Sequence, residues 1–531
     1  MPTLEWIGKD KVINHHNDVP YRVLERKYSF DSAGIHNEDN HSDNMIIHGD
    51  NLEALKSLLP KYEGKIKCIY IDPPYNTGNE GWVYNDNVND PKIKKWLGEI
   101  VGKEGEDLSR HDKWLCMMYP RLQLLQKLLS DEGAIFISID DNELFNLKLI
   151  CDEIMGVTNF IDIITWFKKV SPSNDARYFS NDVEYILVYS KNKNVWNPYR
   201  LPLSEKQLKY YTNPDNDERG RWNSATYTCN KSKEERPNLY YPIINPYTGI
   251  EVYPQETAVW KYSKEQTAIY QAENRLFWGA DGKAKMPRIK KFLSEHEGVV
   301  NRTLWHYDDV NHTQGASLQM KLLGIKGFAT PKPYELIERI LRIASAPDSI
   351  ILDSFAGSGT TAHAVLNMNK KDGGHRKFIL IEREDYADSI TAERVKRVIN
   401  AYGEGKNSVE GTDGDFSYYE LGETMFLPDG QLNPEVRLTD IQQYIWYSEA
   451  HGAVMNRIID EKDYLGSYND TAYYFYYDKD KTTVLDYAYL ATIHVKELAY
   501  VIYADACMLS DSDLEKWNIT FKKIPRDIKR L

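Results

Sequence analysis

The stretch Ile66-Lys67-Cys68-Ile69-Tyr70-Ile71-Asp72-Pro73-Pro74-Tyr75 joins a short apolar run to a rigid polar turn. Such a run is typical of a strand buried in a parallel sheet, and the two prolines just beyond it fix φ and remove backbone donors. Asp72 therefore stands at a defined place at the carboxyl end of a buried strand. Ligands of open α/β sheets bind at this end of the strands.

Strands alternate with helices around this stretch. Before and after it we expect strands at 45–48 and 134–139, and helices at 51–59, ended by Pro60, and at 114–129. The alternation returns late in the chain, with helices at 334–344 and 361–367 and strands at 349–352 and 377–381. This pattern predicts one doubly wound, mostly parallel α/β sheet that is interrupted in the middle of the chain.

Composition divides the chain into five segments. Residues 1–43 are polar and are expected to form an N-terminal extension, while residues 44–194 and 327–404 carry the α/β pattern. Residues 195–326 are rich in Tyr, Asn, Pro and Trp and have little helical periodicity, which predicts an inserted, irregular α+β domain. The acidic residues 405–531 are expected to form a C-terminal accessory domain with a role in dimerisation.

The net charge of −13 is unfavourable for binding DNA, but the charge is unevenly distributed. Residues 401–531 hold 13 basic and 23 acidic side chains, whereas residues 195–330 hold 19 basic and 15 acidic ones. The mildly basic middle segment is therefore compatible with contacts to phosphates, although it does not demand them.

Cysteine usage and hydropathy exclude several other classes of protein. The five cysteines are scattered and form no CxxC pair, which argues against a disulfide framework and a structural zinc site. The sequence has no apolar run near eighteen residues and no basic-then-apolar signal at its N-terminus. We therefore expect a cytoplasmic protein.

The turn Asp72-Pro73-Pro74-Tyr75 suits chemistry on an aromatic amine. The lone pair of an exocyclic amino group is delocalised into its ring, so the nitrogen becomes nucleophilic only when acceptors draw on its hydrogens. Asp72 can accept one of these hydrogens and the carbonyl of Pro73 the other. Pro74 stiffens the turn, and Tyr75 offers a ring for stacking, worth about 1–3 kcal/mol per base. The alternative is an ordinary turn, because Asp, Pro and Tyr all suit turns.

A second motif, Asp353-Ser354-Phe355-Ala356-Gly357-Ser358-Gly359-Thr360-Thr361, follows the predicted strand 349–352. Its glycines let the backbone approach a ligand, and the next helix presents its N-terminus. Glu382, after the strand 377–381, is placed to accept hydrogen bonds from ribose hydroxyls. The third glycine of dinucleotide-binding loops and the Gly-Lys-Thr of P-loops are missing. S-adenosylmethionine (SAM) and other nucleotides stay open as ligands.

Together the two motifs resemble those of the amino-methyltransferase family of SAM-dependent DNA-modifying enzymes. Residues 72–75 match the catalytic tetrapeptide of that family, and residues 355–359 match its Phe-x-Gly-x-Gly loop. The catalytic motif precedes the cofactor loop, as in the circularly permuted β group, where a target-recognition domain lies between the two. The resemblance covers roughly residues 45–400 and implies a seven-stranded, circularly permuted methyltransferase sheet, with residues 195–326 as the target-recognition domain.

The resemblance also implies roles for individual residues. Asp72, Pro73, Pro74 and Tyr75 would be catalytic. Phe355 would pack on the methionine part of SAM, Glu382 would hold its ribose and Asp50 would lie near its adenine, while residues 330–333 match a further SAM-contacting motif. The complete set of predicted cofactor-binding residues is Asp50, Asp72, Thr330, Lys332, Pro333, Asp353, Phe355, Gly357, Gly359, Thr360 and Glu382.

Within the β group, residues 76–78, 110–114 and 138–143 resemble the modification subunits of type III restriction systems. This implies site-specific transfer of a methyl group from SAM to adenine N6 of a flipped base in double-stranded DNA, without a covalent intermediate and with no metal needed. It also implies a homodimer and a separate restriction subunit that carries the helicase and nuclease.

Several alternatives remain open. Cytosine N4 presents the same chemical problem, although Asp at position 72 favours adenine. Three further interpretations are an orphan adenine methyltransferase without a nuclease partner, a protein glutamine methyltransferase, and a specificity module that binds DNA without methylating it. Trp166 and Tyr185 either line the base pocket or belong to the core, and we favour the core.

Overall fold

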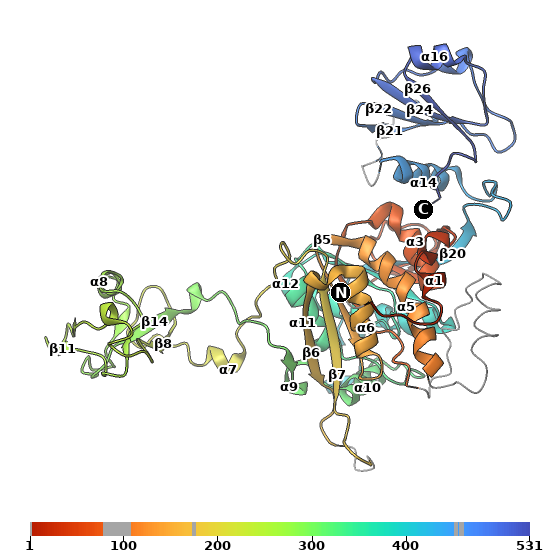
Figure 1. The fold of residues 1–531 in the computed structure, drawn as a ribbon. Coiled ribbons are helices and arrows are strands. Elements are labelled where there is room, and N and C mark those ends of the chain that lie inside the picture. Colours follow the sequence, from red (N-terminus) through yellow and green to blue (C-terminus); the bar gives the residue numbers. More distant parts are fainter. Residues whose placement is uncertain (1–2, 78–107, 173–176, 451–454, 456–460, 531) are drawn as a thin grey trace. The chain divides into compact units, whose positions relative to one another are not determined.

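The computed structural model describes residues 3–77, 108–172, 177–450, 455 and 461–530 (Figure 1). The chain forms two compact units, one of Met1–Tyr199 with Arg302–Leu531 and the other of Arg200–Asn301. The larger unit holds both halves of the predicted α/β pattern, and the smaller one lies within the segment predicted to be an inserted domain.

The larger unit is built on an eleven-stranded sheet with the order β15-β6-β7-β5-β4-β16-β17-β3-β20-β1-β2. The strands are β1 Arg22–Asp31, β2 Gly34–His36, β3 Met45–His48, β4 Ile66–Ile71, β5 Leu129–Ile139, β6 Phe160–Phe167, β7 Val183–Ser190, β15 Leu304–Trp305, β16 Ile350–Asp353, β17 Lys377–Glu382 and β20 Asp415–Thr424. The run from β5 through β4, β16 and β17 to β3 is parallel, whereas β7 is antiparallel to both β5 and β6. The seven strands from β6 to β3 therefore confirm the predicted mostly parallel sheet, and further strands extend both of its edges.

Two groups of helices cover this sheet. The helices of the larger unit are α1 Lys9–Val12, α2 His15–Asp18, α3 Asn51–Tyr62, α5 Leu108–Leu128, α6 Leu144–Cys151, α9 Tyr307–Val310, α10 Thr313–Leu322, α11 Tyr334–Ala344, α12 Thr360–Asp372, α13 Glu393–Asn400, α14 Leu438–Ala450, α15 Tyr487–Leu490 and α16 Asp511–Lys516. Helices α3, α5 and α6 pack together, as do α11, α12 and α13, and the two groups lie on opposite faces of the sheet (Figure 1). This is the doubly wound arrangement that the alternation predicts.

Several predicted helix boundaries differ from the structure; helix α12, for example, ends at Asp372 rather than at Asn367. Helix α3 continues past Pro60 to Tyr62, because a proline in the last turn removes only one hydrogen bond, and the N–H of Glu63 still reaches the carbonyl of Leu59 at 3.0 Å. Helix α5 begins at Leu108 rather than at Trp114. Residues 76–110 are rich in Asn, Gly and Asp and their sequence predicts no regular element; of these, residues 78–107 lie outside the described residues.

The smaller unit is a set of short strands around an aromatic core. Its elements are α7 Glu205–Leu208, β8 Trp222–Thr226, β9 Thr228–Cys229, β10 Ile243–Ile244, β11 Glu251–Val252, β12 Val259–Trp260, α8 Lys264–Ala272, β13 Leu276–Phe277 and β14 Arg288–Phe292. Its buried cluster includes Tyr227, Tyr241, Trp260 and Trp278. The unit is narrower than the predicted segment 195–326, because β15 pairs in parallel with β6 and so joins the main sheet.

Strands from the segments before and after the predicted α/β pattern also join the main sheet. Strand β1, within the predicted N-terminal extension, pairs antiparallel with β20, and β20 pairs in parallel with β3. Farther on, β21 Tyr464–Tyr468, β22 Thr471–Phe475, β24 Ala499–Ala504 and β26 Ile519–Lys523 form a separate four-stranded sheet. Strand β20 therefore belongs to the main sheet although it lies within the segment 405–531, and an accessory domain in that segment stays a prediction.

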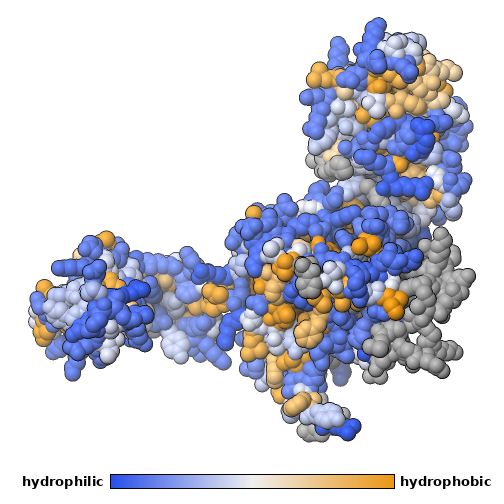
Figure 2. Space-filling view, viewed as in Figure 1, coloured by the Kyte–Doolittle hydropathy of each residue, from blue (hydrophilic) through white to orange (hydrophobic). Residues whose placement is uncertain are grey.

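Hydrophilic residues predominate on the face of the molecule seen in Figure 2, and the apolar residues there form small patches. Across the described stretches, helices are either too short or too polar to cross a membrane.

The centre of the main sheet should dominate the stability of the larger unit. Ile69 on β4 is fully buried and pairs with Leu352 on β16. We expect Ile69→Ala to lower the free energy of unfolding by about 2–5 kcal/mol, through lost burial and the cavity left behind. Ile35→Ala, at a side chain 61% exposed, should change it by less than about 0.5 kcal/mol. Urea denaturation of both variants tests this, and equal losses would contradict the assignment of the core.

Candidate active site

The two sequence motifs meet at one edge of the main sheet. Strands β4 and β16 are parallel neighbours, with Cys68 opposite Ile351 and Ile69 opposite Leu352. Their carboxyl ends therefore carry the turn 72–75 and the loop 353–361 side by side. The edge between two such strands, one from each half of the pattern, is the usual place for a ligand in a doubly wound sheet.

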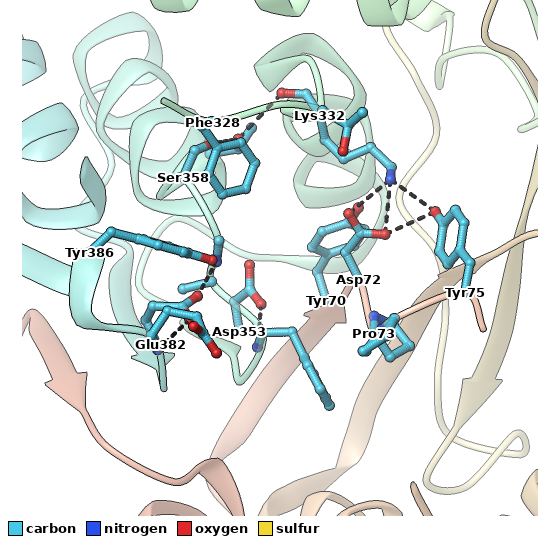
Figure 3. A pocket seen from close by; sticks show the side chains of 17 residues that line it. Tyr70, Asp72, Pro73, Tyr75, Phe328, Lys332, Asp353, Ser358, Glu382 and Tyr386 are labelled. Carbon is cyan, nitrogen blue, oxygen red and sulfur yellow. Dashed lines mark hydrogen bonds and ion pairs between the residues drawn. The ribbon is translucent and has the colours of Figure 1, made fainter. Parts of the chain in front are cut away.

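A cavity of about 440 Å³ opens at this edge (Figure 3). Its lining consists of Tyr70, Asp72, Pro73, Pro74, Tyr75, Phe328, Thr330, Lys332, Asp353, Phe355, Ala356, Gly357, Ser358, Thr360, Glu382, Glu384 and Tyr386. This lining contains four carboxylates, a single lysine and five aromatic rings. The cavity therefore favours a ligand that combines positive charge with flat or apolar parts.

Most of the predicted site residues lie together in this cavity. They are Asp72, Pro73, Pro74, Tyr75, Thr330, Lys332, Asp353, Phe355, Gly357, Thr360 and Glu382. Three predicted residues are not in its lining. Pro333 and Gly359 stand at the N-caps of α11 and α12, while Asp50 caps α3 by accepting a hydrogen bond from the N–H of Leu52 at 2.9 Å. The predicted contact of Asp50 with a cofactor stays a prediction.

The turn 72–75 is held from behind by buried side chains. The indole N–H of Trp114 donates to the carbonyl of Pro74 at 2.7 Å. The next residue, Asn76, is fully buried with φ of 59°, and its amide donates to Glu143. Glu143 also lies 2.6 Å from Nδ1 of His111. Trp114, His111 and Glu143 lie in segments singled out from the sequence, but only the structure shows that they fix this turn.

Asp72 sits in a network of charged and hydroxyl groups. Its carboxylate accepts hydrogen bonds from Nζ of Lys332 at 2.8 and 2.9 Å and from the hydroxyl of Tyr75 at 2.9 Å. The same hydroxyl lies 3.1 Å from Glu184 on β7. Burial raises the pKa of Asp72, and the charge of Lys332 opposes that rise. The strength of Asp72 as an acceptor therefore depends on its neighbours.

The glycine loop is shaped around two other carboxylates. Asp353 accepts from the N–H of Phe355 at 3.0 Å and from the hydroxyl of Thr361 at 2.5 Å. Glu382 accepts from the N–H of Gly357 at 2.7 Å. Gly357 has φ of 53°, and a Cβ there would lie 3.1 Å from the ring of Phe328. Burial raises the pKa of both Asp353 and Glu382 to about 7.

A buried arginine forms hydrogen bonds with the glycine loop on the side of helix α13. Nη1 of Arg394 donates to the hydroxyls of Ser358 at 2.8 Å and Thr360 at 2.7 Å, and its side chain packs beside His363. Burial lowers the pKa of Arg394 to about 10. The residue lies on α13, beyond both motifs, and its sequence position carried no signal of this role.

Sequence reasoning also missed several residues that line the cavity. Tyr70, Phe328, Glu384 and Tyr386 were not singled out, although each lies within a few residues of a predicted motif. The rings of Phe328 and Tyr386 meet edge to face, with centroids 5.7 Å apart. The aromatic residues among them could have been predicted from the sequence, because each lies close to a predicted motif.

A second cavity of about 590 Å³ lies next to the first and shares Tyr75, Thr330 and Lys332 with it. The rest of its lining is Lys168, Lys169, Val170, Ser171, Pro172, Glu184, Thr313, Gln314 and Pro331. Trp166 is 1% exposed, which confirms it as a core aromatic, whereas Tyr185 is only partly buried against the main core; neither residue lines the two cavities.

A sequence profile described as DNA methylase matches residues 66–393, which is more than half of the chain. The span contains the turn 72–75, the glycine loop and Glu382, and every residue that lines the first cavity lies within it.

Individual relatives agree with this match. The chain is 34% identical to the type III restriction-modification enzyme StyLTI Mod subunit of Salmonella typhimurium, over 79% of this chain and 66% of that protein. It is 33% identical to the EcoPI Mod subunit of Escherichia phage P1, over 77% of this chain and 66% of that protein. The chain thus spans slightly less than two thirds of these two relatives.

A third relative is matched over most of its length. The type II methyltransferase M.KpnI of Klebsiella pneumoniae is 33% identical, over 70% of this chain and 89% of that protein. Given this match, the match of the family profile and the joint cavity of the two motifs, the chain belongs to the DNA methylase family.

Proposed function

We propose that this chain is a site-specific DNA methyltransferase that transfers a methyl group from SAM to adenine N6 of a flipped base. We further propose that it is the modification subunit of a type III restriction-modification system, working in the cytoplasm. The observation that carries the proposal is that the amine-binding turn 72–75 and the glycine loop open into one acidic, aromatic cavity.

The first cavity fits SAM in size and in charge. Its volume of about 440 Å³ is within the usual range for small-molecule sites. Four carboxylates suit the positive charge of a sulfonium, and Phe355 and Tyr386 offer apolar contact to the rest of the molecule. Glu382, close beside the loop, would accept hydrogen bonds from ribose hydroxyls. When bound there, SAM supplies an electrophilic methyl group.

The residues of the turn prepare the nucleophile. Asp72 and the carbonyl of Pro73 accept hydrogen bonds from the target amine and direct its lone pair away from the ring. Tyr75 stacks on the base, and the second cavity, which shares Tyr75 and Lys332 with the first, receives it. Flipping costs a few kcal/mol, which such contacts offset.

The proposed partners follow from the same assignment. Arg200–Asn301, with 16 basic and 13 acidic residues, would read the DNA sequence. The relatives that are named as Mod subunits support a separate restriction subunit as a partner. A homodimer would let one copy read the site while the other methylates it.

Replacing Asp72 should abolish methylation. We expect a short DNA motif to gain N6-methyladenine in cells that express the chain, and Asp72→Ala to remove it, with the purified variant at least about 100-fold slower because a preorganised polar contact is lost. Single-molecule sequencing of genomic DNA with detection of modified bases measures this. Asp10→Ala, at a side chain 75% exposed, is the matched control and should leave the motif methylated.

Each outcome of that experiment is informative. Methylation of one strand of an asymmetric motif would support the type III assignment. Modified cytosine in place of adenine would refute adenine as the target, and full methylation by Asp72→Ala would refute the role of the turn.

Binding of SAM should depend on pH through Glu382. The pKa of Glu382 is about 7, and only its ionised form accepts hydrogen bonds from both ribose hydroxyls. Protonation turns one of its two acceptor oxygens into a donor, so we expect affinity to fall as pH drops below 7, by up to about tenfold per pH unit. Calorimetric titration between pH 5.5 and 7.5 measures the effect. Glu382→Gln should bind more weakly with a flatter profile, and an unchanged slope would contradict the assignment.

A further inference from the structure

The ammonium group of Lys332 occupies the carboxylate of Asp72, one of the two acceptors that a target amine would need. Nζ of Lys332 lies 2.8 and 2.9 Å from the two carboxylate oxygens of Asp72 and 2.8 Å from the hydroxyl of Tyr75 (Figure 3). The side chain of Lys332 is 12% exposed. The sequence motif around it predicts a contact with the cofactor, but in the structure its charged end points at Asp72.

A second buried carboxylate lies on the other side of this ammonium. Oε2 of Glu184 is 3.4 Å from Nζ of Lys332, and its other oxygen accepts from Nζ of Lys168 at 3.0 Å. Glu184 is 8% exposed. Asp72, Lys332, Glu184 and Lys168 thus form a row of alternating charges that runs from the first cavity into the second.

Each charge in the row depends on its neighbours. Burial raises the pKa of Asp72, Lys332 lowers it, and Glu184 raises it again. Burial also raises the pKa of Glu184, but Lys332 and Lys168 outweigh it and the pKa ends below its ordinary value. Asp353 on β16 adds negative charge near Asp72. Lys332 is the cation in contact with both carboxylates.

The protonation state of Asp72 matters for the proposed chemistry. An ionised carboxylate offers only hydrogen-bond acceptors. A protonated carboxyl group presents an O–H donor on one of its oxygens, and that oxygen no longer accepts a hydrogen bond from the amine. Without a cation beside it, a buried carboxylate tends to take up a proton. A target amine needs Asp72 ionised at the moment when the base enters.

Building on the proposed function, we propose that Lys332 is a positioning residue that holds Asp72 ionised and in place until the target amine takes over its position. As the amine arrives, the ammonium gives up its bonds to Asp72. It keeps Glu184 and the hydroxyl of Tyr75, two acceptors that the amine does not use. Glu184 is therefore the second anchor of Lys332, which explains a buried carboxylate that has no part in binding the amine.

The test is the pH profile of the single-turnover methylation rate, measured with saturating SAM and a duplex that carries the target motif in its unmethylated form. We expect Lys332→Met to shift the acid limb upward by about one pH unit or more, so that the rate is about tenfold lower below the midpoint and recovers at higher pH. Glu184→Gln removes a negative charge and should shift the limb downward. Lys332→Arg keeps the charge and should stay closer to the wild-type profile than Lys332→Met.

A lysine in a different ion pair is the matched control. Nζ of Lys148 lies 2.7 Å from Asp152, away from both cavities. Lys148→Met should leave the midpoint of the profile unchanged. The proposal is overturned if Lys332→Met slows the reaction equally at every pH, or if Lys332→Met and Glu184→Gln move the limb in the same direction.

A second measurement needs no methyl transfer. Infrared titration of protein labelled with ¹³C-aspartate, with Asp72→Asn as the reference, follows the Asp72 carboxyl group directly. The midpoint of Asp72 should rise in Lys332→Met and fall in Glu184→Gln. Unchanged midpoints would overturn the proposal even in an active enzyme, whereas shifted midpoints in a chain that methylates no DNA would support the ion pair and refute the proposed function alone.

Discussion

The parallel pairing of β4 with β16 is the constraint on which the site depends. Each strand ends in one of the two motifs, and neither motif forms a cavity alone. Asp72 and Lys332, 260 residues apart in the chain, meet only because their elements flank this pair. Long-range parallel pairing is stabilised by burial on both faces, which is why both strands consist almost entirely of apolar residues.

The buried carboxylates at this site need hydrogen-bond donors or opposite charges beside them. Both Asp353 and Glu382 lie at strand ends beneath the glycine loop, and backbone N–H groups satisfy part of each carboxylate. Asp72 has no such backbone donor among its described hydrogen bonds and relies on Lys332 and Tyr75 instead. The acceptor aimed at the proposed substrate is thus supported by side chains that can move, while the carboxylates that shape the loop are fixed by backbone.

Local pattern was sufficient to predict the sheet and most of the first cavity. Strands β3 and β4 agree with the expected ranges, and eight predicted residues of the turn and loop line the cavity, because glycine, proline and acid at strand ends have few other roles. Arg394 and the second cavity were beyond reach, because they arise from contacts between distant segments. The strands added at the two sheet edges follow from the pairing of β15 with β6 and of β20 with β3 and β1, which no local period encodes.

The row of charges through Asp72 and Glu184 is difficult to explain by stability alone. A buried ion pair usually contributes little net stability, because removing both partners from water costs as much as their attraction returns. Apolar side chains in the same space would hold β7 against the turn at least as well. The two lysines oppose the protonation that burial favours at the two carboxylates, and an acceptor that must be ionised before its substrate arrives gains from that arrangement.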